Sequence, residues 1–220
     1  MPPYAGCFTS LYLDICPAAV QSVSMSHIGN TQRLRPVADT GPAPAALPEY
    51  LEQDGRPLVY LTLGTVHNHA PLLRPAVEAL SALPVRLLVT VGPDGDPEGL
   101  GSLPSNVWVE RWVPQPQVLQ HCHVVASHAG SGTFLGALSQ GRPQLCLPQG
   151  ADQFRNAQGG AHAGAAIALY PDEATPQAVA LAVARLLAED GFRLSACQVA
   201  ADIAAMPSPA EVVEKLVQLP

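Results

Sequence analysis

The sequence predicts an α/β fold, a parallel sheet of about six strands with helices on both faces. Short apolar, β-branched runs alternate with helix-periodic segments between residues 58 and 170, which is typical of parallel strands joined by right-handed crossovers. The composition, 48% hydrophobic and 13% charged, is that of a globular chain rather than a disordered one. With 220 residues, the chain is long enough to bury a substantial core.

Each strand is predicted from an apolar run that ends at glycine, proline or polar residues. The first run, 58–63, ends at Gly64, and the second, 85–91, ends at a turn cluster over 92–97. Further strands are predicted at 106–109, 123–127, 144–147 and 165–169. Helices are predicted at about 70–82, 115–120, 132–140, 152–162, 175–189, 191–205 and 208–218. Ligands bind outside the carboxyl ends of such strands, so the loops there are the candidate site.

The first 57 residues differ from the rest of the chain. They hold proline- and glycine-rich pieces such as 40–48 and show little sustained periodicity, which argues against a self-contained domain there. We therefore divide the chain into the tail of a preceding domain with its linker (1–57), an α/β domain (58–205) and a C-terminal helix (206–220).

Charge and cysteine content exclude several classes of partner and location. The net charge of −7 argues against binding nucleic acid through general electrostatics. No run approaches 18 consecutive apolar residues, so no membrane span is expected, and no secretory signal is visible. The five cysteines are scattered and none forms C-x-x-C, which is typical of a reduced, cytoplasmic chain.

The most informative segment is a glycine-rich turn, His128 to Thr133, between a predicted strand and a predicted helix. Glycines let the backbone approach a ligand, and the first N–H groups and the dipole of a helix favour a phosphate or diphosphate. Ser131 and Thr133 add hydroxyl donors, and His128 is expected to face the same anion. The alternative is close helix–strand packing, with a helix cap from Ser131 or Thr133.

Two further loops carry candidate ligand contacts. Trp112 follows a predicted strand, where an indole can stack on a flat base, and the alternative is that it belongs to the core. Asp152 and Gln153 open a predicted helix, and a carboxylate beside an amide suits sugar hydroxyls. The alternative for Asp152 is a plain N-cap.

The segment His121-Cys122-His123 is a candidate metal site. Two histidines in an H-x-H pattern lie on one face of a strand and can share a metal. No carboxylate or second thiol follows at a usual ligand spacing. The residues are better explained by a helix end or a strand edge, and no metal is expected.

Taken together, these segments resemble the donor-binding half of the GT-B glycosyltransferases of family 1, which use nucleotide sugars. The match is in order and in spacing. The matching motifs are L-T-L-G-T (61–65), W-x-P-Q (112–115), H-x-G-x-G-T (128–133) and P-x-x-x-D-Q-x-x-N (148–156). The resemblance covers nearly the whole chain, firmly from about 58 to 170. It implies a Rossmann-like C-terminal half of a GT-B fold.

The resemblance implies a role for each matching residue. Trp112 would stack on the nucleobase, with Val113 at the base edge and Gln115 near the ribose. The diphosphate would be held by Thr65, His128, Gly130, Ser131, Gly132 and Thr133. Asp152 and Gln153 would contact the sugar hydroxyls. No metal or other cofactor is implied, and the family's catalytic histidine lies in its N-terminal half, so no catalytic residue is expected here.

One departure from the family bears on the donor. Many members carry Glu three residues after the motif's threonine, where it accepts a hydrogen bond from a ribose hydroxyl. Gly136 occupies that position and has no side chain to bind a 2′-hydroxyl. This fits thymidine diphosphate (TDP), whose deoxyribose lacks the group, and resembles the bacterial natural-product branch. We therefore expect a TDP-sugar donor, and specifically a deoxysugar.

The implied function is the donor half of an inverting glycosyltransferase that transfers a sugar to a hydroxyl of a natural-product aglycone. The acceptor would be bound by a half outside this chain, to which the 206–220 helix would cross back. We expect this chain alone to bind nucleotide without turnover. The alternatives are a UDP-sugar-dependent lipid or sterol glycosyltransferase and a non-catalytic, transferase-like activator. Homodimer formation is left open.

Overall fold

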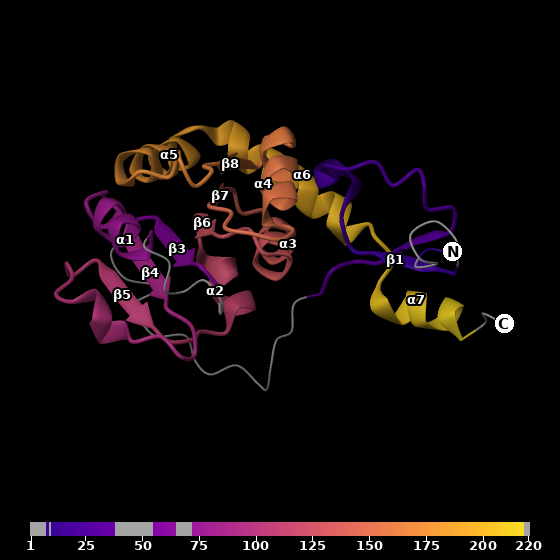
Figure 1. The fold of residues 1–220 in the computed structure, drawn as a ribbon, viewed down its shortest axis with the longest axis horizontal. Coiled ribbons are helices and arrows are strands. Elements are labelled where there is room, and N and C mark those ends of the chain that lie inside the picture. Colours follow the sequence, from indigo (N-terminus) through magenta and orange to yellow (C-terminus); the bar gives the residue numbers. More distant parts are fainter. Residues whose placement is uncertain (1–7, 9, 38–54, 65–71, 218–220) are drawn as a thin grey trace.

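A computed structural model describes residues 8, 10–37, 55–64 and 72–217. Six strands form one parallel sheet in the order β5-β4-β3-β6-β7-β8 (Figure 1). Their bounds are β3 Leu58–Thr62, β4 Arg86–Thr90, β5 Val107–Glu110, β6 Val124–Ser127, β7 Gln144–Cys146 and β8 Ala166–Ala168. The predicted parallel α/β fold is confirmed, and every predicted strand is present.

The order in which strands are added reverses at β3. This strand pairs in parallel with β4 on one side and with β6 on the other, so that Leu61 lies opposite both Val89 and Ala126. The order is that of the doubly wound Rossmann sheets, which bind ligands in the crevice where the strand order reverses. The loops after β3 and β6 are therefore the centre of the expected site.

Helices cover both faces of the sheet. One face packs against α1 (Leu73–Ser81) and α5 (Pro176–Ala188). The other packs against α2 (Gln115–His121), α3 (Ser131–Ser139), α4 (Gln153–His162) and α6 (Asp190–Ala204). In β3, Val59 and Leu61 enter the first core, whereas Leu58 and Tyr60 enter the second. Because both faces are buried, the strands are continuous apolar runs rather than alternating ones.

The N-terminal segment contains structure that its sequence did not predict. Strands β1 (Tyr12–Asp14) and β2 (Thr31–Arg33) form a separate parallel pair. Figure 1 shows β1 beside α7 (Pro209–Leu216) and away from the main sheet. Hydrogen bonds join the β2 region to the α7 region: Lys215 Nζ of α7 donates to Gln32 Oε1 of β2 at 3.1 Å, and Arg35 N donates to Pro207 O at 2.8 Å. Strands of three residues are too short to show a period.

A short 3₁₀ helix, η2 (Ala18–Val20), connects this segment to the main body. Val20 is buried against α4 and α6, and a Cβ on Gly159 would overlap its carbonyl oxygen. Gly159 and Gly160 lie in the last turn of α4, and the chain turns at Gly164, whose φ is +71°. Gly159 and Gly160 allow close packing at the end of α4.

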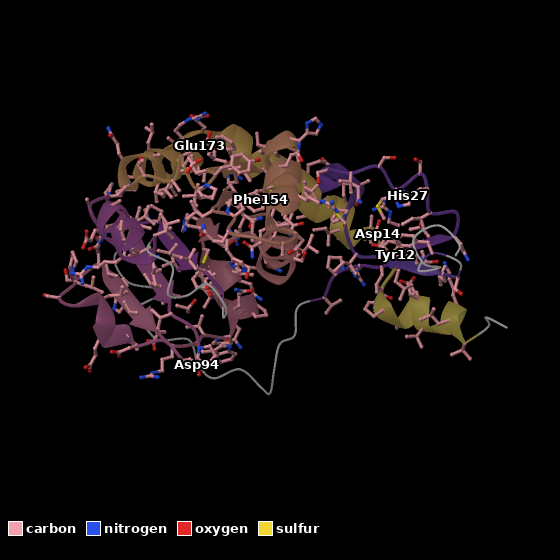
Figure 2. The ribbon with its side chains drawn as sticks, viewed as in Figure 1. Tyr12, Asp14, His27, Asp94, Phe154 and Glu173 are labelled. Atoms are coloured by element: carbon pink, nitrogen blue, oxygen red, sulfur yellow. The ribbon has the colours of Figure 1, made fainter. Side chains whose placement is uncertain are left out.

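Two features complete the description. The turn cluster predicted over 92–97 leads into a second 3₁₀ helix, η4 (Pro97–Leu100), capped by Asp96. Figure 2 shows Tyr12, Asp14 and His27 together on the N-terminal segment, and Phe154 in the α/β part.

The proline-rich stretch 40–48 lies outside the described residues, and the three-part domain division stays a prediction. In the described part of the chain, no helix combines the length and apolar character needed to cross a membrane.

Candidate functional site

A cleft of about 370 Å³ opens at the carboxyl ends of the four strands around the reversal in strand order. Its wall is made by the residues that end or follow β3 to β6 and by the start of α3. They are Tyr60, Thr62, Gly64, Thr90, Gly92, Pro93, Arg111, Trp112, Val113, Gln115, His128, Gly130, Ser131, Gly132 and Thr133. The cleft therefore lies where a fold of this topology binds its ligand.

The charge of this cleft is opposite in sign to that of the protein. The net charge is −7, yet the described wall contains no acidic side chain and does contain Arg111 and His128. At the start of α3, Gly130 is the N-cap residue, and none of the described side chains caps the helix there. The alternative of a cap from Ser131 or Thr133 is thus not observed. Uncapped first-turn N–H groups beside two basic side chains favour an anion.

The position of His128 depends on glycines from two different strand ends. A Cβ on Gly130 would overlap the imidazole at Nε2, and a Cβ on Gly64 would overlap it at Cε1. Gly64 also has a left-handed backbone, with φ of +77°, which glycine adopts without strain. The ring of His128 is therefore placed between the loops after β3 and β6, next to the start of α3.

Trp112 is exposed rather than part of the core. It is 65% exposed and lines the cleft, whereas the next residue, Val113, is buried against Val118 and Leu119. The alternative that Trp112 packs in the core is wrong. Because Val113 anchors the chain just beyond β5, the indole is held at the cleft wall and is accessible to a flat ligand.

A polar network lies at the base of the cleft. Gln115 Nε2 donates to Thr133 Oγ1 at 3.1 Å and to the Tyr60 hydroxyl at 3.5 Å. The hydroxyl groups of Tyr60 and Thr90 lie 3.0 Å apart. Burial raises the pKa of Tyr60 above its ordinary value, so its hydroxyl stays protonated at neutral pH. The network ties α2, α3, β3 and β4 together beneath the ligand space.

Several residues of the wall were missed from the sequence. Thr62 and Thr90 end their strands, Tyr60 lies near the end of β3, and Arg111 directly follows β5. Their position at the carboxyl ends of predicted strands was the available signal, because the ligand face of a parallel sheet lies at that edge.

The loop before α4 makes a second polar cluster. Asp152 is the N-cap residue of α4, but within the described residues its side chain makes no cap bond, so the plain N-cap alternative is not observed. Its Oδ2 instead accepts hydrogen bonds from Ser131 Oγ at 2.6 Å and from Asn156 Nδ2 at 3.2 Å. The nearby Gln153 is buried, and its Oε1 accepts two backbone N–H groups, from Gln149 at 2.7 Å and Gly150 at 3.0 Å.

A larger cleft of about 630 Å³ adjoins the first. The residues that line both clefts are Trp112, Val113, Gln115, Ser131 and Gly132. The second cleft continues along Gly136 to residues 34–37 and Pro209. A Cβ on Gly136 would lie 3.3 Å from Cδ1 of the buried Leu119, so a side chain at this position of the cleft would press on the core.

The structure brings most of the predicted site residues together. The first cleft is lined by Trp112, Val113, Gln115, His128, Gly130, Ser131, Gly132 and Thr133. Asp152 and Gln153 do not line it, although Asp152 reaches it through Ser131. Thr65 lies outside the described residues. The ligand contacts assigned to all these residues stay predictions.

The two histidines of the candidate metal site, His121 and His123, have structural positions in the fold. His121 ends α2, and His123 Nδ1 accepts the N–H of Leu58 at 3.1 Å. Cys122 between them is buried and donates to Val118 O at 3.1 Å, and burial raises the pKa of its thiol to about 12. In the described ranges, no three His, Cys, Asp or Glu side chains are grouped so that they could hold a metal.

Comparisons with known proteins identify a family and relatives that resemble this chain. The family described as "Erythromycin biosynthesis protein CIII-like, C-terminal domain" matches residues 76–219. Elloramycin glycosyltransferase ElmGT of Streptomyces olivaceus is 35% identical over 208 residues, which are 93% of this chain and 52% of that protein. TDP-daunosamine transferase DnrS of Streptomyces peucetius is 35% identical over 207 residues, which are 90% of this chain and 48% of that protein.

A solved structure extends the comparison to the fold. Spinosyn rhamnosyltransferase SpnG complexed with thymidine diphosphate matches with a TM-score of 0.82 and 31% identity, over 93% of this chain and 55% of that chain. The chain spans about half the length of the curated relatives that it matches.

Proposed function

Since this chain belongs to the family of erythromycin biosynthesis protein CIII-like C-terminal domains, we propose that it is the donor-binding half of a TDP-sugar-dependent glycosyltransferase. One observation carries the proposal: a cleft at the reversal in strand order, with no acidic side chain among its described lining residues, joins an exposed indole to the start of α3, where no described side chain caps the helix. The names of two relatives support TDP as the nucleotide, since DnrS is a TDP-daunosamine transferase and SpnG was solved with thymidine diphosphate.

The donor lies across the boundary of the two clefts. Thymine stacks on the Trp112 indole, Val113 backbone groups meet the base edge, and Gln115 lies by the deoxyribose. The diphosphate lies against the N–H groups of 130–133 and the imidazole of His128. The Thr133 hydroxyl already accepts from Gln115, so the phosphate and ribose contacts are coupled.

In the proposed reaction, the role of the donor-binding half is to stabilise the diphosphate leaving group. An acceptor hydroxyl attacks the anomeric carbon and loses its proton to a base, while the carbon–oxygen bond to the diphosphate breaks and TDP departs with the electron pair. Negative charge therefore builds on the diphosphate oxygens. Preorganised N–H groups, the helix dipole and His128 lower the energy of that charge. We propose that these groups replace a divalent metal.

The sugar lies towards α4. The Asp152 carboxylate, held by Ser131 and Asn156, accepts hydrogen bonds from sugar hydroxyls. Gln153 contributes its amide nitrogen, because its Oε1 is engaged by two backbone N–H groups. The preference for TDP over UDP follows from Gly136, since a 2′-hydroxyl enclosed beside it would lose water without gaining a partner.

The acceptor and the catalytic base belong outside these 220 residues in this proposal, as the chain spans about half of its relatives. The segment β1–β2 with α7 is the part that would meet the acceptor half. The relative named for elloramycin favours a natural-product aglycone over a lipid or sterol, whereas the name of DnrS specifies only its donor sugar. Cys16, Cys122, Cys146 and Cys197 are free thiols, in keeping with a cytoplasmic enzyme.

Calorimetric titration of this chain with TDP, UDP, GDP and ADP tests the proposal. We expect TDP to bind most tightly. Absence of binding by every nucleotide would refute the donor site and favour the non-binding, transferase-like module. UDP binding as tight as TDP would refute the TDP preference. Incubation with a TDP-sugar and an aglycone should yield no glycoside, and product formation would show that this chain alone is catalytic.

A further inference from the structure

Ala129, between His128 and Gly130, has an unusual backbone conformation. Its φ is +62°, in the left-handed region that residues with a Cβ rarely adopt, and it is fully buried. Two side chains hold it there. Ser127 Oγ accepts its N–H at 3.0 Å, and Asn156 Nδ2 donates to its carbonyl oxygen at 2.9 Å. The turn that leads into α3 therefore depends on a residue of α4.

The amide group of Asn156 holds more than this carbonyl. Its nitrogen also lies 3.2 Å from Ser131 Oγ and 3.2 Å from Asp152 Oδ2. An amide has two hydrogens, so one serves Ala129 and the other is shared between Ser131 and Asp152. Because the Ser131 hydroxyl donates to Asp152 at 2.6 Å, it is committed to that carboxylate. One side chain thus connects the turn after β6, the start of α3 and the start of α4.

This connection matters because Asp152 is anionic. Its carboxylate lies one hydroxyl group away from the start of α3, where the proposed diphosphate would add more negative charge. Hydrogen bonds from Ser131 and Asn156 fix the carboxylate and offset part of its charge. Without Asn156, the carbonyl of the buried Ala129 would lose its side-chain partner, and the carboxylate would be free to turn towards the phosphates.

We infer that Asn156 is a positioning residue for the donor. It does not contact the diphosphate. It holds the left-handed turn at Ala129 and the carboxylate of Asp152, so that the N–H groups of α3 and the sugar-contacting carboxylate face the same ligand. The inference rests on the proposed function of the cleft.

The first test compares Asn156→Ala with a matched control, Asn106→Ala. Asn106 is buried, whereas Asn156 is partly buried, and Asn106 donates to two carbonyl oxygens, Ser81 O at 3.1 Å and Val85 O at 3.0 Å, at the amino-terminal edge of the sheet, opposite the cleft. We expect Asn156→Ala to weaken TDP binding about tenfold or more while thymidine, which has no phosphate, binds within about twofold of wild type. Asn106→Ala should lower the melting temperature without changing TDP affinity.

A rescue variant isolates the turn. Glycine adopts a left-handed conformation without strain, so Asn156→Ala combined with Ala129→Gly should recover several-fold of the lost TDP affinity, on the order of threefold or more. Unchanged TDP affinity in Asn156→Ala would overturn the inference. So would an equal loss for TDP and thymidine, because that pattern marks general damage to the fold. Failure of the rescue would overturn the role assigned to the Ala129 turn.

A readout without ligand separates this inference from the proposed function. Wild-type protein that does not bind TDP would refute the function of the cleft. Amide hydrogen exchange in the free protein still tests the positioning role. Exchange at Ala129, relative to Leu61 in the central strand, should be at least about tenfold faster in Asn156→Ala and unchanged in Asn106→Ala. An unchanged relative rate in Asn156→Ala would overturn the inference.

Discussion

A Cβ atom on Gly64 would lie 2.6 Å from Cε1 of His128, so the chain after β3 and the chain after β6 share one small space. The two strands are neighbours at the reversal of strand order. The position of the histidine is therefore a property of the sheet as well as of its own glycine-rich turn. A residue with a side chain at position 64 or 130 would displace the imidazole.

Gly130→Ala tests whether the position of the His128 ring matters for TDP binding. The added methyl would overlap Nε2 of the ring and push it from the start of α3. We expect TDP to bind about tenfold to a hundredfold more weakly, the cost of losing hydrogen bonds to a charged group. Gly191→Ala in α6, where a Cβ meets nothing within 4 Å, is the matched control and should bind normally. Normal calorimetric affinity in Gly130→Ala would contradict the role of His128.

Trp112→Ala tests whether the thymine base stacks on the indole. Loss of base stacking should weaken TDP binding about tenfold to a hundredfold, and since the indole is 65% exposed the melting temperature should barely change. The chain has two tryptophans, and we assign the ligand-induced change in fluorescence to Trp112. Trp108→Phe, a conservative change of a partly buried residue, should keep that signal. A signal that survives in Trp112→Ala would count against stacking there.

Gly136→Glu tests the choice of nucleotide. A carboxylate at this position can accept a hydrogen bond from a 2′-hydroxyl, so UDP should gain affinity relative to TDP by about fivefold to tenfold. Gly136→Ala shares the tight contact with Leu119, at 3.3 Å from the Cβ, and controls for packing. The ratio of the two dissociation constants, measured for both variants, isolates the carboxylate. An equal ratio in the two variants would argue against a ribose near position 136.

His123 should make stability depend on pH. Burial, followed by the charges of Arg142 and Arg86, lowers the pKa of His123 below its ordinary value. The unfolded chain therefore takes up this proton first as the pH falls. The contribution of His123 is complete above about pH 6.5 and is lost as the pH falls from there towards the lower pKa of the folded state.

His123→Asn removes the titration while keeping an acceptor for the N–H of Leu58. The drop in melting temperature between about pH 7.5 and about pH 5.5 should be smaller in the variant than in wild type. His123 is exposed, so we expect a difference of a few degrees at most. Identical pH profiles would show that His123 titrates as it does in the unfolded chain.

Sequence reasoning succeeded where the signal is local. The strand run 58–63 and the helix after Gly130 follow from apolar periodicity and from glycine positions, and both are present as β3 and α3. It failed where local chemistry competes with packing. Asp152 is a typical capping residue at the N-cap position of α4, but its carboxylate accepts hydrogen bonds from Ser131 and Asn156 instead of capping the helix.

By itself, the sequence determined the order of strands and helices, the loops that carry the site, and the identity of most residues of the cleft, because periodicity and motif spacing are properties of neighbouring residues. Only the tertiary structure decided that Trp112 is exposed, that His128 lies against Gly64, and that Asn156 holds Ala129. Those relations join residues far apart in the chain. They arise only once strand order and helix packing have placed separate loops at one edge of the sheet.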